Sequence, residues 1–136
     1  MIIISKHITL DEATKSPTAI RNGIDNTPSV EVAKNMILVA NKVFEPLREW
    51  YGKPIRVNSF YRCEELNKLV GGSKTSDHVK GMAIDMDAGS IEENKKLFDW
   101  CIANLEFTQI INEYNFSWVH ISYDKNNLKK QILVIK

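Results

Sequence analysis

The longest periodic segment of the chain lies between residues 24 and 54. Apolar side chains recur there at steps of three and four, a spacing that places them on one face of an α-helix packed against the core. Thr27 followed by Pro28 is typical of a helix start, Pro46 predicts a kink, and Gly52 indicates the end. The apolar positions are Ala33, Met36, Ala40, Val43, Leu47 and Trp50.

The rest of the chain alternates between shorter helical and strand-like segments. Residues 54–62 alternate like a strand, residues 63–70 form a short helix that Gly71 ends, and Ser90 is a candidate N-cap for a helix over 91–105. Helices followed by mostly antiparallel strands predict an α+β fold, with a central sheet flanked by helices. The last strand-like runs are residues 107–114, 117–123 and 131–136.

Composition limits the classes of protein that fit. A chain of 136 residues with 43% hydrophobic and 26% charged residues predicts one globular domain over residues 1–136, which we expect to be a monomer. A net charge of +1 argues against a nucleic-acid partner. The apolar runs are too short for an export signal or a membrane anchor, so we expect synthesis in the cytoplasm. Cys63 and Cys101 are expected to be reduced and largely buried.

The segment SDHVKGMAIDMD, residues 76–87, carries the first candidate chemistry. His78 and Asp85 lie seven residues apart with Gly81 between them, and residues 82–87 alternate like a strand that follows a loop. On such a strand Asp85 shares one face with Ala83 and Asp87. A carboxylate beside an apolar strand is unfavourable unless it is paired or bound to a metal, so we interpret this segment as part of a metal site.

A catalytic zinc site usually has three protein ligands, which requires one more. His120 lies in the apolar segment SWVHIS, on one strand face with Trp118 and Ser122, whereas His7 lies in a polar N-terminal stretch and is a poorer choice. A lone strand histidine is more often a packed core residue than a ligand. The combination of the three residues is what favours a metal centre.

These segments resemble the signatures of the zinc D-alanyl-D-alanine peptidases, specifically their small phage type. SDHVKGMAIDMD and SWVHIS match the Ser-x-His-x6-Asp and Trp-x-His motifs, and VNSFYR and LNKLVGG match two upstream segments. The likeness runs from about residue 8 to residue 123. It implies a small α+β domain whose central antiparallel sheet holds Zn2+ through His78, Asp85 and His120.

The resemblance also implies roles for residues around the metal. Arg62 matches an arginine that places a substrate carboxylate or polarises the scissile region, and Ser59 matches a position near it, although Phe60 replaces the usual glycine. Some relatives place an acid where this chain has Ser117. In the phage type the general base is instead matched by Glu113, which shares a strand face with Gln109 and Ile111. The residues expected to contact the substrate are Arg62, Ser59 and Gln109. Asp77 and Asp87 are the next candidates for the base.

The function that this resemblance implies is hydrolysis of amide bonds in the peptides of bacterial peptidoglycan, as a carboxypeptidase or an endopeptidase. Without an export signal, such an enzyme would reach the cell wall after release, as a phage endolysin does, or as part of a virion. The alternatives are a noncatalytic binding or structural module of a virion and a cytosolic dipeptidase acting on free D-Ala-D-Ala.

Overall fold

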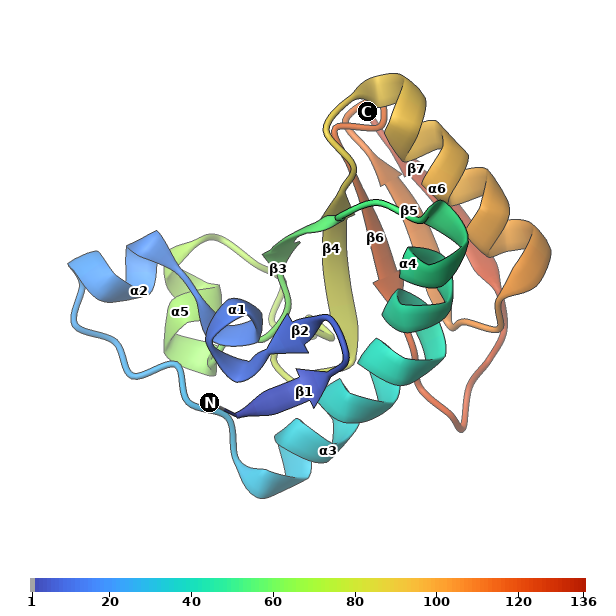
Figure 1. The fold of residues 1–136 in the computed structure, drawn as a ribbon. Helices are drawn as coiled ribbons and strands as arrows, with labels where there is room; N and C mark the ends of the chain where they lie inside the picture. The colour runs from blue at the N-terminus through green and yellow to red at the C-terminus, as the bar shows by residue number, and fades with distance from the viewer. Residues whose placement is uncertain (1) are drawn as a thin grey trace.

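A five-stranded β-sheet organises the chain in the computed structural model, which describes residues 2–136 (Figure 1). Neighbouring strands are antiparallel except β7, which pairs with β5 in parallel register. The predicted α+β class is confirmed, and the parallel edge strand is a feature that the sequence pattern did not indicate. In spatial order the strands are β3 (Arg56–Ser59), β4 (Ala83–Asp87), β6 (Trp118–Ser122), β5 (Gln109–Glu113) and β7 (Gln131–Ile135).

The predicted long helix is present as three consecutive elements on one side of the sheet: α3 (Val30–Val39), the π-helical turn η1 (Ala40–Phe44) and α4 (Glu45–Tyr51). The expected N-cap at Thr27 is wrong, because the Ser29 side chain accepts the Val32 N–H, whereas the Thr27 hydroxyl donates to Asp25. The expected distortion near Pro46 occurs as the π-turn just before it, since a proline ring crowds the carbonyl four residues earlier.

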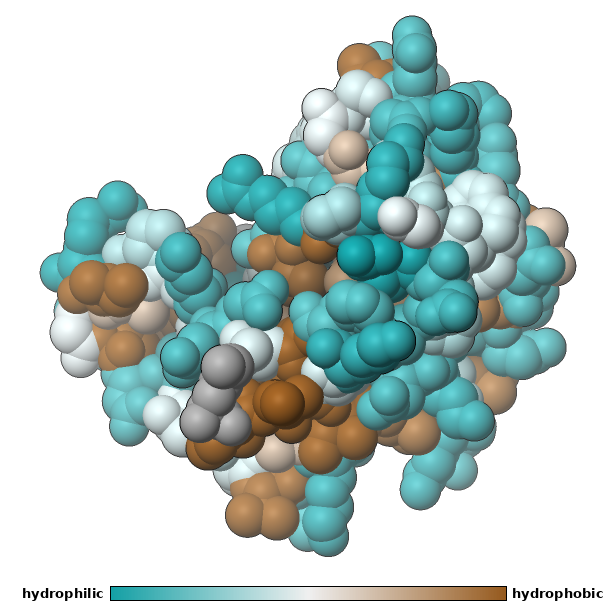
Figure 2. Space-filling view, viewed as in Figure 1, coloured by the Kyte–Doolittle hydropathy of each residue, from teal (hydrophilic) through white to brown (hydrophobic). Residues whose placement is uncertain are grey.

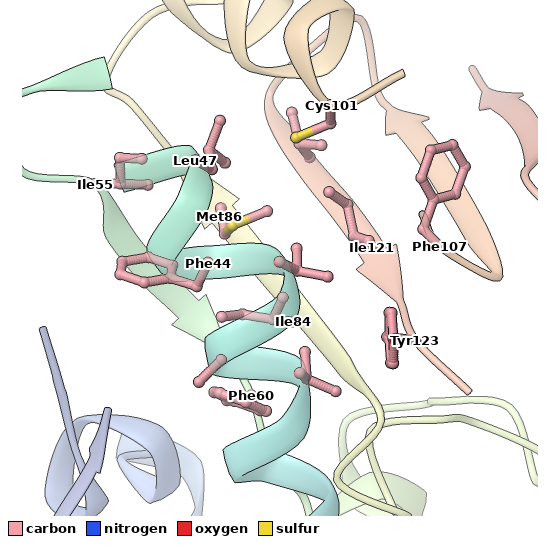
Figure 3. Close-up of a cluster of buried hydrophobic side chains, with 14 of the residues drawn as sticks. Phe44, Leu47, Ile55, Phe60, Ile84, Met86, Cys101, Phe107, Ile121 and Tyr123 are labelled. Atoms are coloured by element: carbon pink, nitrogen blue, oxygen red, sulfur yellow. The ribbon is translucent and has the colours of Figure 1, made fainter. Parts of the chain in front are cut away.

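The core lies between this helical layer and one face of the sheet, together with α6 (Ile91–Asn104). Alternate strand residues such as Ile84, Met86 and Ile121 meet helix residues such as Leu47 and Cys101 (Figure 3). Because strand side chains alternate between faces, Asp85 and His120 lie on the opposite face, away from α3 and α4. The core therefore fixes which residues are available to build a site.

The N-terminal residues form small elements that the pattern did not predict. They are β1 (Ile3–Ser5), β2 (Ile8–Thr9), α1 (Leu10–Thr14) and α2 (Pro17–Arg21), and they gather with α5 (Glu64–Leu69) at the left of Figure 1. The surface on this side of the molecule mixes hydrophilic and apolar areas, with apolar residues exposed beside the N-terminus (Figure 2). Among residues 2–136, every helix is too short or too polar to cross a membrane.

Candidate active site

The three predicted metal ligands come together on the open face of the sheet. Candidate ligand atoms of His78, Asp85 and His120 all lie within 4.8 Å of one another. Asp85 Oδ2 is 3.2 Å from His78 Nε2, and Asp85 Oδ1 is 2.8 Å from His120 Nδ1. Asp85 and His120 meet because they are directly opposite in the β4–β6 register, where antiparallel partners project to the same side.

His78 reaches Asp85 from the turn that precedes β4. Gly81 closes this turn, since its N–H donates to the His78 carbonyl over 3.2 Å, and it has a left-handed φ of +71°. A Cβ on Gly81 would lie 2.8 Å from the Val32 carbonyl oxygen and 2.7 Å from Met36 Cγ. Glycine is therefore required both for the backbone angle and for close packing of the turn against α3.

The hydrogen bonds of His78 fit a role as a metal ligand. Nδ1 is 2.7 Å from the Phe60 carbonyl oxygen, which can only accept, so Nδ1 carries a hydrogen. In the neutral ring Nε2 then presents a lone pair toward Asp85 Oδ2. Two acceptors facing each other require a proton or a metal ion between them. Two imidazoles and a carboxylate form a donor set that zinc favours. The Phe60 carbonyl accepts from the other ring nitrogen of His78 and so fixes the orientation of the ring, as acceptors behind metal-bound histidines commonly do.

Electrostatics keep Asp85 ionised for this role. Burial alone would raise the pKa of Asp85, but hydrogen bonds and charge from His120 and His78 outweigh it and hold the pKa well below its ordinary value. Burial likewise acts to lower the pKa of His120, and the neighbouring Asp85 raises it above the ordinary value. The carboxylate is thus ionised at neutral pH, which is the form that metal binding requires.

Arg62 lines the cavity of about 490 Å³ that opens beside the three ligands. Its Nε is buried without a hydrogen-bond partner, and a terminal nitrogen lies 3.5 Å from the Ser76 hydroxyl. Within residues 2–136, no carboxylate lies at ion-pair distance from the Arg62 guanidinium. Burial lowers the pKa of Arg62, and the charges of Asp85 and Glu113 oppose this shift. An unpaired guanidinium in a cavity is suited to binding a carboxylate.

Asn26 fixes the backbone that carries Arg62. Its side chain accepts the Cys63 N–H over 2.7 Å and donates to the carbonyls of Thr14 and Tyr61 over 2.9 and 3.0 Å. Buried amides with all their bonds satisfied hold a segment rigidly. The N-terminal part of the chain thereby positions a residue of the cavity.

Glu113 and Gln109 line the same cavity from β5, as the strand alternation predicted. Glu113 lies opposite Trp118 in the β5–β6 register, and the Trp118 indole Nε1 donates a hydrogen bond to its carboxylate. Gln109 Nε2 donates to the Gln131 side chain over 2.9 Å. The cavity therefore holds a carboxylate with a fixed orientation on the ligand face of the sheet.

A further wall of the cavity is formed by residues 70–77, all of which line it except Lys74. Asn67 supports this wall, because its amide donates to the Ser73 carbonyl over 2.8 Å. A Cβ on Gly72 would lie only 2.0 Å from Asn67 Oδ1, so the contact requires glycine. The consecutive glycines of LNKLVGG thus allow the wall to pass close to α5.

Other predicted residues lie elsewhere. Ser59 is half-buried on β3 and is not part of the cavity lining, although its neighbour in the register is Asp85. Ser117 is exposed in the β5–β6 turn, and Asp87 accepts bonds from Gly89 and Asn94 outside the cavity. Of the two reserve candidates for the base, Asp77 alone lines it.

The sequence analysis did not identify two contributions to the site. The Phe60 carbonyl is a backbone atom, so no residue type could have indicated it. Tyr114 lines the cavity and lies 5.3 Å from the Trp118 ring, centroid to centroid. The only sequence feature that pointed to Tyr114 was its position directly after Glu113. The predicted strand continued through Tyr114, however, and alternation would then have placed the Tyr114 side chain on the face opposite Glu113.

Comparison with known proteins supports the expected relationship. Residues 6–122 match the family described as Peptidase M15, which covers all three ligands, Arg62 and Glu113. A search of curated proteins finds no significant match. The match spans most of the chain and agrees with the metal-binding geometry, so the chain belongs to the zinc-dependent peptidase M15 family, the family of the D-Ala-D-Ala peptidases.

Proposed function

We propose that this protein is a zinc-dependent peptidase that hydrolyses an amide bond next to a carboxylate in bacterial peptidoglycan peptides. The observation that carries the proposal is the convergence of His78, Asp85 and His120 beside a cavity that also holds Arg62 and Glu113. Family membership supports the general activity. The ligand set supports zinc, and the unpaired guanidinium supports a substrate carboxylate.

Each residue has a distinct part in the reaction. A bound zinc ion would polarise the scissile carbonyl and make water more acidic. Glu113, oriented by Trp118, would accept a proton from the attacking water and pass it to the nitrogen of the leaving amine. One C–O bond forms, one C–N bond breaks, and Glu113 returns to its starting state. Arg62 would hold the substrate carboxylate so that the scissile bond lies at the metal.

A carboxylate subsite favours carboxypeptidase action on a D-Ala-D-Ala terminus. We infer this finer assignment from Arg62, and stem pentapeptides ending in a free acid or in an amide distinguish the possibilities. Cleavage of the acid form alone supports a carboxypeptidase. Equal cleavage of both, or cleavage only within crosslinked dimers, identifies an endopeptidase. The resemblance to the small phage type supports a role in phage-mediated degradation of the cell wall.

Metal analysis tests the zinc assignment. After reconstitution and desalting, the parent should retain about one zinc per chain. His78→Ala and His120→Ala should lose most of it. His7→Ala is the matched control, because His7 pairs with Glu45 and does not line the cavity. Zinc retained at the parental level in both ligand variants would refute the assignment.

Hydrolysis of defined muropeptides, followed by mass spectrometry, tests the catalytic assignment. Glu113→Gln keeps the size of the side chain but cannot accept a proton, so hydrolysis should fall by roughly 10²-fold or more with zinc retained. Glu106→Gln, an exposed carboxylate outside the cavity, is the control. Parental activity in Glu113→Gln would remove Glu113 from the reaction. An inactive parent that binds zinc and peptidoglycan would instead support the noncatalytic module.

A further inference from the structure

The turn between β5 and β6 has the handedness that L-amino acids disfavour. Tyr114, Asn115 and Phe116 have φ values of 51°, 55° and 58°, and the Ser117 N–H donates to the Glu113 carbonyl over 3.1 Å. Residues other than glycine and asparagine rarely adopt this backbone conformation, and those that do are usually single residues. Three such residues in succession, two of them aromatic, must be held by their surroundings.

Asn94 of α6 makes two side-chain hydrogen bonds to carbonyls of this turn. Its side chain is almost completely buried, with a relative exposure of 1%. Nδ2 lies 2.9 Å from the Phe116 carbonyl and 3.3 Å from the Ser117 carbonyl, and it also contacts Asp87 at 3.0 Å. Oδ1 accepts the Ala88 N–H over 2.6 Å. One side chain thus ties the turn to the end of β4.

Further contacts hold the turn on its other sides. Asn112 Oδ1 accepts the Phe116 N–H over 2.6 Å, and the Ser117 hydroxyl donates to the Tyr114 carbonyl over 2.6 Å. The Phe116 ring packs edge-to-face against Phe98, with centroids 5.4 Å apart. The turn is therefore fixed from the helical side of the sheet.

The same turn joins residues that line the cavity on the opposite face. Glu113 precedes it and Trp118 follows it, and the two form the last register pair of the hairpin. The indole of Trp118 donates to the Glu113 carboxylate, and Tyr114, the first left-handed residue, packs against that indole. A change in the handedness of the turn would move all three side chains.

We propose that Asn94 is a positioning residue for the reaction. It does not line the cavity, but it holds the left-handed turn and, through it, the Trp118–Glu113 pair and Tyr114. The catalytic part of this inference rests on the proposed function, since it takes Glu113 as the base. The structural part, control of the Trp118–Glu113 hydrogen bond, is independent of it.

The test compares Asn94→Ala with Asn94→Ala/Asn115→Gly in the zinc-loaded protein. Glycine adopts positive φ freely, so at position 115 it should restore the turn without replacing the lost contacts. Asn104→Ala is the control, because Asn104 is an exposed amide of the same helix that contacts only the Trp100 carbonyl. The readouts are zinc content, muropeptide kinetics and the ¹H–¹⁵N signal of the Trp118 indole, assigned with Trp118→Phe.

We expect Asn94→Ala to keep its zinc, to lose tenfold or more in kcat with a smaller change in KM, and to shift the Trp118 indole signal toward that of a solvent-bonded indole. Asn115→Gly should partly reverse both changes. An unchanged indole signal and kcat in Asn94→Ala would overturn the proposal. The proposal would also be overturned if Asn115→Gly restored the melting temperature of Asn94→Ala but neither the indole signal nor kcat.

Asn94→Ala could fail to fold, because it removes several buried hydrogen bonds. In that case Asn115→Val replaces it as the test variant. Asn115 is exposed, so a β-branched residue there opposes the positive φ of the turn without altering the core. Loss of the bonded indole signal and of kcat supports the proposal, and their retention refutes it. If the parent cleaves no muropeptide, the proposed function fails, while the indole signal still decides whether Asn94 controls the Trp118–Glu113 contact.

Discussion

Replacing Gly81 by alanine tests whether close packing of one turn builds the metal centre. Gly81 closes the turn that carries His78, and it combines a φ of +71° with contacts to α3 that leave no room for a side chain. Gly71 is a matched control, because its φ of +78° is nearly the same while nothing lies within 4 Å of its missing Cβ. The two alanine variants therefore share the backbone strain and differ in the clash.

The expected losses of stability follow from these two terms. Left-handed backbone disfavours alanine by about 1–2 kcal/mol, and reduced freedom of the unfolded chain returns about 0.4–1 kcal/mol. Gly71→Ala should therefore lose roughly 1 kcal/mol. In Gly81→Ala the Cβ would lie 2.8 Å from the Val32 carbonyl oxygen, a backbone atom that cannot rotate away. Overpacking of this kind adds about 1–3 kcal/mol, so its total should reach roughly 2–4 kcal/mol.

Urea unfolding of zinc-free protein, followed by tryptophan fluorescence, measures these differences. The extra loss in Gly81→Ala should also lower the melting temperature by about 4–12 °C more than Gly71→Ala does, at roughly 4 °C per kcal/mol for a chain of this length. A zinc titration should show weaker binding in Gly81→Ala, since the displaced turn carries His78. Equal losses in the two variants would refute the argument from packing.

Three further outcomes are expected. Burial alone would raise the pKa of Glu45, but its hydrogen bonds to His7 outweigh this and lower the pKa. The ionised carboxylate therefore stabilises the fold above about pH 4.3, the ordinary pKa of a glutamate, and this stabilisation is lost as the pH falls through the folded pKa. Urea unfolding of zinc-free Glu45→Gln should show a deficit of about 1–3 kcal/mol at pH 7 that shrinks as the pH falls through the lowered pKa of Glu45. A persistent deficit would contradict this origin. Cys101 is buried as expected, but Cys63 is only half-buried, and burial raises the pKa of the Cys101 thiol. A thiol reagent should therefore label Cys63 in the native protein and both cysteines only after unfolding, and equal native rates would refute the buried assignment. Arg62→Lys keeps the charge but loses the planar fork, so kcat/KM for a peptide ending in a free acid should fall by about tenfold or more, and an equal fall for the matching amide would exclude recognition of the terminal carboxylate.

Local periodicity predicted which face of each strand carries the candidate chemistry. Strict alternation over residues 82–87 put Asp85 on the face opposite Ile84 and Met86, and His120 was predicted to share a strand face with Trp118 and Ser122. In the structure Ile84 and Met86 pack in the core, and Asp85 meets His120 across the β4–β6 register on the other face. The three- and four-residue spacing of the long helix likewise identified its buried face, where Met36, Ala40 and Leu47 are fully buried. The prediction was wrong for Trp50, which is 46% exposed and stacks on Trp100 at the surface. Such predictions succeed because side-chain direction in a regular element depends only on local periodicity.

Tertiary structure decided the contacts that depend on residues far apart in the chain. The Phe60 carbonyl orients His78 across 18 positions, and Asn94 holds the Phe116 carbonyl across 22. A backbone carbonyl has no residue-type signal, and the asparagine could equally have been a surface residue of its helix. The left-handed turn at 114–116 runs against local preference, so it exists only because buried side chains from α6 and β5 stabilise it. The parallel pairing of β7 with β5 is similar, since the alternation of a strand does not specify the direction of its neighbour.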